Sequence, residues 1–143
     1  MKGQFSRDWS LLKLARNWEP RDIGCDVMER LYARGPPEVR EAILTEVEAV
    51  GAEDSIRYIG RMPDFMRGPD ILESLFLITH IECERRTEGD RQYLIVSPSC
   101  GTMFTFRDCT PAIAAAYLKG FIGAVVPDIP VETDDGLLVL ILS

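Results

Sequence analysis

The stretch PAIAAAYLKGFIGAVV, at residues 111–126, decides the fold. Only Lys119 is charged in it, so most of the circumference of the helix that it predicts is expected to be buried. Thr110 can cap such a helix, Pro111 suits the first helical position, and Pro127 ends the segment. The pattern therefore predicts a buried helix over about residues 111–126.

Strand-like segments lie on both sides of this predicted helix. Residues 76–97 predict a β-hairpin, in which Thr87-Glu88-Gly89-Asp90 is the turn and QYLIVS, at residues 92–97, is the returning strand. After the helix, residues 130–132 suggest a short edge segment. The continuous apolar run over about residues 136–142 predicts a final buried strand, central in a small antiparallel sheet.

The first half of the chain, residues 1–75, is predicted to be mainly helical. Asp8 and Asp22 are expected to cap the first two helices, Pro37 to open the third, and Gly51 to end it before a short fourth helix. Each helix has one narrow apolar stripe that needs a partner. We therefore expect one α+β domain over residues 1–143, in which N-terminal helices pack with a small sheet and the buried helix.

The second predicted helix has its apolar residues on one face. Ile23, Val27 and Leu31 recur at a spacing of four residues and share one face. A chain of 143 residues is long enough to bury such faces in one core but too short for two comfortable domains.

Composition and charge exclude several classes of protein. The net charge is −7 and the sequence pI is about 4.7, so direct binding of nucleic acid is disfavoured. The N-terminal apolar run is broken by Lys13 and Arg16, which does not fit a signal peptide. The apolar segment at residues 111–127 is too short for a comfortable membrane span. We expect a cytoplasmic protein with reduced cysteines and no membrane contact.

Small residues form a row along the predicted helix at residues 111–126. They recur every four residues, at Ala112, Ala116, Gly120 and Ala124. Glycine inside a helix costs about 1 kcal/mol relative to alanine, so this row must serve a purpose. Close packing against another backbone is one interpretation. The other is a ligand channel floored by the row and walled by Ile113, Tyr117 and Phe121.

Four cysteines, Cys25, Cys83, Cys100 and Cys109, and the histidine His80 are the candidates for metal or thiol chemistry. No Cys-x-x-Cys pattern is present. If residues 76–86 formed one strand, His80 and Cys83 would point to opposite faces. We therefore expect no metal site and no cofactor, with Cys83, Cys100 and Cys109 as weak metal candidates.

Cys109 also stands just before the predicted helix start, where a thiolate would be stabilised. A redox pair with Cys100 is one interpretation. A small buried hydrophobic residue, the more common role of an unpaired cysteine, is the other. No serine-hydrolase elbow, phosphate loop or dinucleotide fingerprint occurs in the sequence, and we do not expect an enzyme.

The run CTPAIAAAYLKGFIGA, at residues 109–124, resembles the helical segment of 4-vinyl-reductase-type domains, in which a cysteine precedes an aromatic-Leu-x-Gly-aromatic stretch. The preceding hairpin and the following Val131-Glu132 and apolar strand keep the same order, over about residues 70–143. The resemblance implies a fold like that of the small subunits of the TRAPP vesicle-tethering complex. It also implies domains that bind hydrophobic small molecules or act as sensors, and that often dimerise. Members with a zinc site carry further cysteines in the last strands, where this chain has none.

Three functions follow as hypotheses. The first is a non-enzymatic binding or sensory domain for a hydrophobic small molecule, with the ligand-binding candidates Ile113, Tyr117, Gly120, Phe121 and Cys109. The second is a homodimeric structural or assembly protein. The third is a thiol-based redox protein that uses Cys109.

Overall fold

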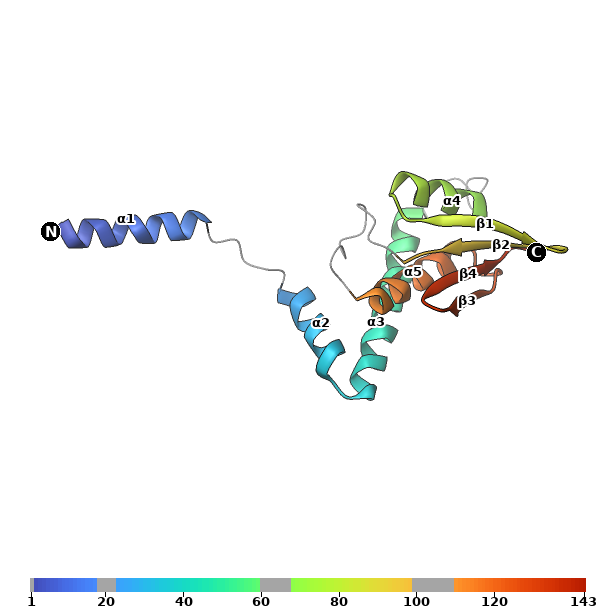
Figure 1. The fold of residues 1–143 in the computed structure, drawn as a ribbon, viewed down its shortest axis with the longest axis horizontal. Helices are drawn as coiled ribbons and strands as arrows, with labels where there is room; N and C mark the ends of the chain where they lie inside the picture. Colours follow the sequence, from blue (N-terminus) through green and yellow to red (C-terminus); the bar gives the residue numbers. More distant parts are fainter. Residues whose placement is uncertain (1, 18–22, 60–67, 99–109) are drawn as a thin grey trace.

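The computed structural model describes residues 2–17, 23–59, 68–98 and 110–143. Figure 1 shows the arrangement of the helices and strands in these ranges. The helices are α1 (Lys2–Asn17), α2 (Ile23–Arg34), α3 (Pro37–Ile59), α4 (Pro69–Ile78) and α5 (Pro111–Val125), and the strands are β1 (Cys83–Glu88), β2 (Arg91–Val96), β3 (Val131–Asp134) and β4 (Leu137–Ile141). Helices packed on a small antiparallel sheet confirm the predicted α+β class, and the predicted buried helix is α5.

Two hairpins make the sheet, in the order β1-β2-β4-β3, with every neighbouring pair antiparallel. In the first turn Gly89 has a φ of 61°, as predicted for the glycine of that turn. Asp135 and Gly136 both have positive φ in the second turn, with values of 47° and 78°. Such a pair suits a two-residue hairpin loop. The final apolar strand, β4, lies between β2 and β3 and is central, as expected.

The first hairpin begins later than predicted. Residues 76–78 belong to α4 rather than to a strand, and β1 begins only at Cys83. Phe76 lies one helical turn after Leu72, and both side chains are fully buried. The apolar residues that suggested a strand therefore supply the inner face of a short helix, because an apolar run by itself does not distinguish the two.

Two helix boundaries also differ from expectation. Gly51 does not end the third helix: α3 continues through it to Ile59 and includes most of the expected short fourth helix. Asp8 does not cap α1, which begins at Lys2, so Asp8 lies inside the helix. Asp22 lies outside the described residues. Gly51 is retained inside α3 because another backbone passes against it, as described below.

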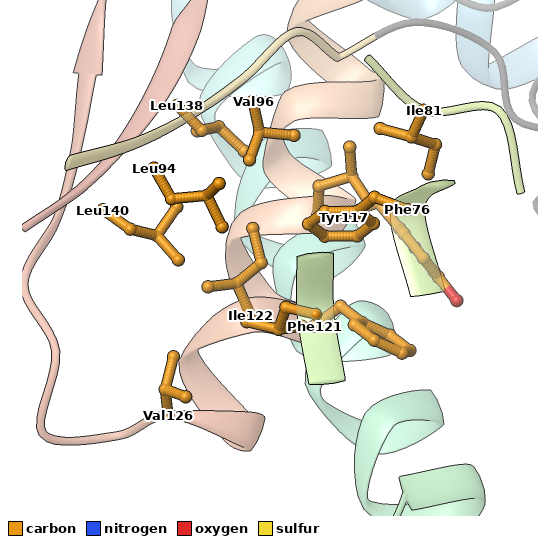
Figure 2. Packing of buried hydrophobic residues seen from close by; sticks show 12 residues of the cluster. Phe76, Ile81, Leu94, Val96, Tyr117, Phe121, Ile122, Val126, Leu138 and Leu140 are labelled. Atoms are coloured by element: carbon orange, nitrogen blue, oxygen red, sulfur yellow. The ribbon is translucent and has the colours of Figure 1, made fainter. Parts of the chain in front are cut away.

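The core lies between the sheet and the helices α4 and α5. The inner side chains of the sheet, such as Leu94 and Leu140, meet Phe76 of α4 and Ile122 of α5. Figure 2 shows these side chains pointing toward one another. Helix α5 buries seven of its residues, namely Ile113, Ala114, Tyr117, Leu118, Gly120, Phe121 and Ile122. The prediction that most of its circumference is buried is confirmed.

Polar contacts join α2 to the start of α5 and α4 to β1. The carboxylate of Glu29 in α2 accepts hydrogen bonds from the backbone N–H of Thr110, at 2.8 Å, and from its hydroxyl. Thr110 directly precedes α5, as predicted, but the prediction that its side chain caps the helix was wrong. Its hydroxyl is bonded to Glu29 instead. Arg85 of β1 forms ion pairs with Asp70 and Glu73 of α4, each at 2.5 Å.

Helix α1 stands apart from the sheet. Figure 1 shows it beyond α2, at the opposite end of the molecule from the strands. All its side chains from Ser6 to Asn17 are exposed, and it makes no substantial contact with another described element. Helix α2 packs on α3, but none of the residues of α2 is buried. We refer to α1 and α2 together as the helical arm. No helix among the described residues has the length and apolar character needed to cross a membrane.

Candidate functional site

Helices α3 and α5 touch through their backbones at two glycines, Gly51 and Gly120, which we call the helix crossing. A Cβ atom built on Gly120 would lie 1.9 Å from the carbonyl oxygen of Glu48 in α3. A Cβ atom built on Gly51 would lie 2.1 Å from the carbonyl oxygen of Tyr117 in α5. No side chain fits at such distances, so both positions require glycine. At Gly120 the small-residue row serves close approach, which was the first of the two interpretations.

The side chains expected to wall a ligand channel lie in the interior. Ile113 is 1% exposed, Phe121 is 3% exposed and Tyr117 is 9% exposed. The rings of Tyr117 and Phe121 are stacked, with their centroids 6.3 Å apart. Figure 2 shows both rings on the side of α5 that faces Phe76 of α4. The structure thus brings these residues together with Gly120, while Cys109 lies outside the described residues. Their role in ligand binding stays a prediction.

The hydroxyl of Tyr117 has an acidic partner that no local sequence pattern indicated. It donates a hydrogen bond of 2.5 Å to a carboxylate oxygen of Asp54 in α3. Burial raises the pKa of the Tyr117 phenol, and the hydrogen bond and negative charge of Asp54 raise it further. The phenol is therefore a fixed donor that keeps its proton, which suits a structural contact between α3 and α5 better than proton transfer.

The next residue along α3, Ser55, has a buried hydroxyl. Its side chain is 1% exposed, and its oxygen has no hydrogen-bond partner within the described part of the chain. An unpaired buried hydroxyl costs stability. Asp54 and Ser55 thus place two polar groups beside an otherwise apolar helix interface.

The thiol and metal candidates are only partly described. Cys83 lies on the inner face of β1 and packs against the core. Burial raises the pKa of its thiol, and the negative charge of Glu73 raises it further. Cys83 therefore remains a neutral thiol and a poor nucleophile. Cys100 and Cys109 lie outside the described residues, so the redox and metal hypotheses that involve them stay predictions.

His80 and Cys83 do not belong to one strand, so the premise of the prediction that they point to its opposite faces was wrong. His80 precedes β1 and has a φ of 59°, in the left-handed region, at the turn after α4. Alternation along a strand therefore does not describe the pair. Among the residues that the structure describes, no three metal-ligating side chains gather into a cluster.

The second candidate site is the exposed face of α2. Val27, Arg30, Leu31 and Arg34 follow one another at helical spacing, and with Gly35 they line a hollow of about 270 Å³. Val27 is 47% exposed and Leu31 is 48% exposed, while Ile23, one turn earlier, is 71% exposed. The spacing of these three apolar residues was predicted correctly. The sequence did not show that their face would remain open.

The same openness continues in α1. Trp9 and Leu12 lie on one side of this helix, with Lys13 and Arg16 beside them, as the spacing of three and four residues requires. The ammonium group of Lys13 lies 5.6 Å from the centre of the Trp9 ring. On other sides of the helix Leu11 and Leu14 are 55% and 64% exposed. Among the described residues, the helical arm thus carries seven exposed large apolar side chains, namely Trp9, Leu11, Leu12, Leu14, Ile23, Val27 and Leu31.

Comparison with family models and with curated proteins finds no match for this chain. The site is therefore interpreted from its own geometry.

Proposed function

We propose that this protein is a homodimeric assembly module whose helical arm binds a second copy. The observation that carries the proposal is the exposure of large apolar side chains along the whole arm, with values from 45% for Leu12 to 71% for Ile23. Large apolar side chains gathered on exposed helices in this number indicate an interaction site.

The stability of α1 gives the proposal a physical reason. A helix of 16 residues without tertiary contacts is only marginally stable in water, since most helical stability in proteins comes from packing of an apolar face. Helix α1 makes no substantial contact with the rest of the described chain. A partner that covers Trp9 and Leu12 would supply the missing packing.

Charge favours a second copy as that partner. Helix α1 carries four basic residues and one acidic residue, a net charge of +3. The whole chain has a net charge of −7, so the remainder carries −10. The positively charged α1 is attracted to the negatively charged remainder of an identical chain. A two-fold arrangement lets both copies make this contact at once.

Binding of a hydrophobic small molecule is a second candidate, favoured by the hollow on α2. Its walls combine apolar side chains with Arg30 and Arg34, which would suit a ligand with an apolar body and an anionic group. The kinship with 4-vinyl-reductase-type domains, which would imply such a ligand, is likewise a proposal. The hollow is open and lies on the same arm, so a partner helix and a ligand would compete for it.

Native mass spectrometry and light scattering on the purified chain distinguish these functions. We expect twice the monomer mass of 16.1 kDa at micromolar concentration. The double substitution Leu12→Glu and Leu14→Glu should give a monomer, because it places charge on two sides of α1. The matched control, Ser6→Glu with Ser10→Glu, adds the same charge at exposed polar positions and should remain dimeric.

A wild-type chain that is monomeric at every concentration would refute the assembly proposal. A monomer that retains an additional mass, lost on denaturation, would instead support the binding of a small molecule.

A further inference from the structure

The sheet has a second face that the core does not use. Side chains alternate along each strand, and the register pairs Ile95 with Val139 and Tyr93 with Ile141 across β2 and β4. These four side chains point away from the inner face formed by Leu94, Val96, Leu138 and Leu140. With Leu137 they form what we call the outer sheet face: Tyr93, Ile95, Leu137, Val139 and Ile141.

No residue of the outer sheet face belongs to the hydrophobic core or to the apolar side chains packed against it. All five are only half-buried, although they occupy the two central strands. A one-sided antiparallel sheet ordinarily presents polar side chains to water at such positions. Five apolar residues together on the face opposite the core therefore indicate a surface that another element covers.

Acidic side chains border this surface on the side of β3. Glu132 is paired with Val139 and Asp134 with Leu137, so both carboxylates share the outer face, and both are exposed. On the opposite side, Glu84 and Arg86 of β1 are paired with each other at 3.4 Å. The free charge around the outer sheet face is therefore negative and is concentrated along one edge.

Helix α1 matches this surface in size, polarity and charge. At about 1.5 Å per residue it is roughly 24 Å long, and strands of five or six residues give a face about 17–20 Å long. Trp9 and Leu12 lie on one side of the helix, with Arg16 between them in projection and Lys13 at their flank. Seated on its apolar residues, the helix turns the same side, with both cations, toward the sheet whose β3 edge carries Glu132 and Asp134.

We propose that α1 of one copy lies on the outer sheet face of a second copy, with Lys13 and Arg16 along the Glu132–Asp134 edge. This inference rests on the proposed homodimer and names the surface that receives the arm. The partner is a second copy rather than the same chain because α2, α3 and α5 separate α1 from its own sheet, as Figure 1 shows. A reciprocal exchange buries two α1 helices and two outer sheet faces in one closed dimer.

Charge reversal on each surface tests the pairing. Variant A carries Lys13→Glu and Arg16→Glu, and variant B carries Glu132→Lys and Asp134→Lys. Each alone should dimerise with a dissociation constant roughly tenfold or more above that of the wild type, since attraction at the edge becomes repulsion. Mixed in equal amounts, A and B should form a heterodimer in native mass spectra, because the reversed helix of A then meets the reversed edge of B and the unchanged helix of B meets the unchanged edge of A.

The control for variant B is Glu41→Lys with Glu46→Lys, which makes the same change of net charge on exposed positions of α3. This control should dimerise as tightly as the wild type. If it is weakened as much as variant B, net charge alone governs association and the inference is overturned. The inference would also be overturned if variant B dimerised like the wild type while variant A was weakened, because α1 would then bind a different surface of the second copy. The proposed assembly function would stand in that case.

A wild-type chain that is monomeric, with the amides of α1 protected from hydrogen exchange, would show that α1 packs within its own chain and would overturn both proposals. A monomer whose α1 amides are unprotected would also overturn both proposals, because α1 would then be covered by neither copy.

Discussion

The helix crossing and the helical arm use helices in opposite ways. At the crossing, two backbones come so close that Gly51 and Gly120 leave no room for a Cβ atom. In the arm, α1 and α2 carry large apolar side chains that no described element covers. The crossing is packed within one chain, whereas the arm leaves large apolar side chains exposed. The difference separates residues that maintain the fold from residues that we propose bind a partner.

The largest effect is expected at the crossing. Gly120→Ala should lower the free energy of unfolding by about 3 kcal/mol or more, at the upper end of the range for overpacking, because the new methyl group meets the backbone of α3 rather than a flexible side chain. Chemical denaturation followed by circular dichroism measures the change.

Gly123→Ala is the matched control, since nothing lies within 4 Å of a Cβ atom at that position of α5. It should be neutral or should stabilise the protein by up to about 1 kcal/mol through helix propensity. Equal losses in the two variants would mean that the crossing is not closely packed.

A smaller effect is expected where Tyr117 joins the two crossing helices. Tyr117→Phe removes the hydrogen bond to Asp54 and should cost about 1.5–2 kcal/mol at neutral pH, at the lower end of the range for hydrogen bonds to charged groups. The folded state raises the pKa of this phenol above its ordinary value of 10.0. Stability that comes from keeping Tyr117 protonated is therefore fully present below pH 10 and is lost as the pH rises above it.

Urea denaturation of both proteins between pH 8 and pH 11 checks this sign. The advantage of the wild type over Tyr117→Phe should shrink above pH 10, because the unfolded tyrosine then ionises while the folded one does not. An advantage that stays constant across this range would mean that the hydroxyl is not held by Asp54.

The smallest effect is expected in the arm. Leu12 is 45% exposed, so Leu12→Ala should change the free energy of unfolding by less than about 0.5 kcal/mol when the protein is dilute enough to be monomeric. At higher concentration, where the proposed dimer forms, the same substitution should reduce stability further. A loss in the dilute chain as large as that of Tyr117→Phe would show that the arm packs within one copy.

Local signals predicted one part of this fold and tertiary contacts decided the rest. Pro111 opens α5 and Gly89 forms the hairpin turn because the constraint lies in the residue itself. Gly51 was expected to end α3, since glycine weakens an isolated helix, and the close approach of α5 overrides that tendency. Phe76 was expected in a strand, because apolar composition alone does not distinguish a buried strand from a short buried helix.

The candidate site was predictable to a similar extent. The row that contains Gly120 was identified from its spacing, and close backbone approach was one of its two interpretations. Asp54 and Gly51 were not connected with it, because a contact between residues far apart in the sequence leaves no local pattern. The apolar face of α2 was also identified, but its exposure depends on which elements are near it, and spacing does not reveal that.

The helix crossing also restricts how this sequence can change during evolution. A larger residue at either Gly51 or Gly120 forces the two helices apart, and that separation would in turn disturb the contact between Tyr117 and Asp54. The two glycines should therefore persist together in descendants whose surfaces, including the arm, have diverged beyond recognition. A pair of glycines at these two places, in a chain with the same order of helices and strands, would then identify distant relatives that overall sequence identity misses.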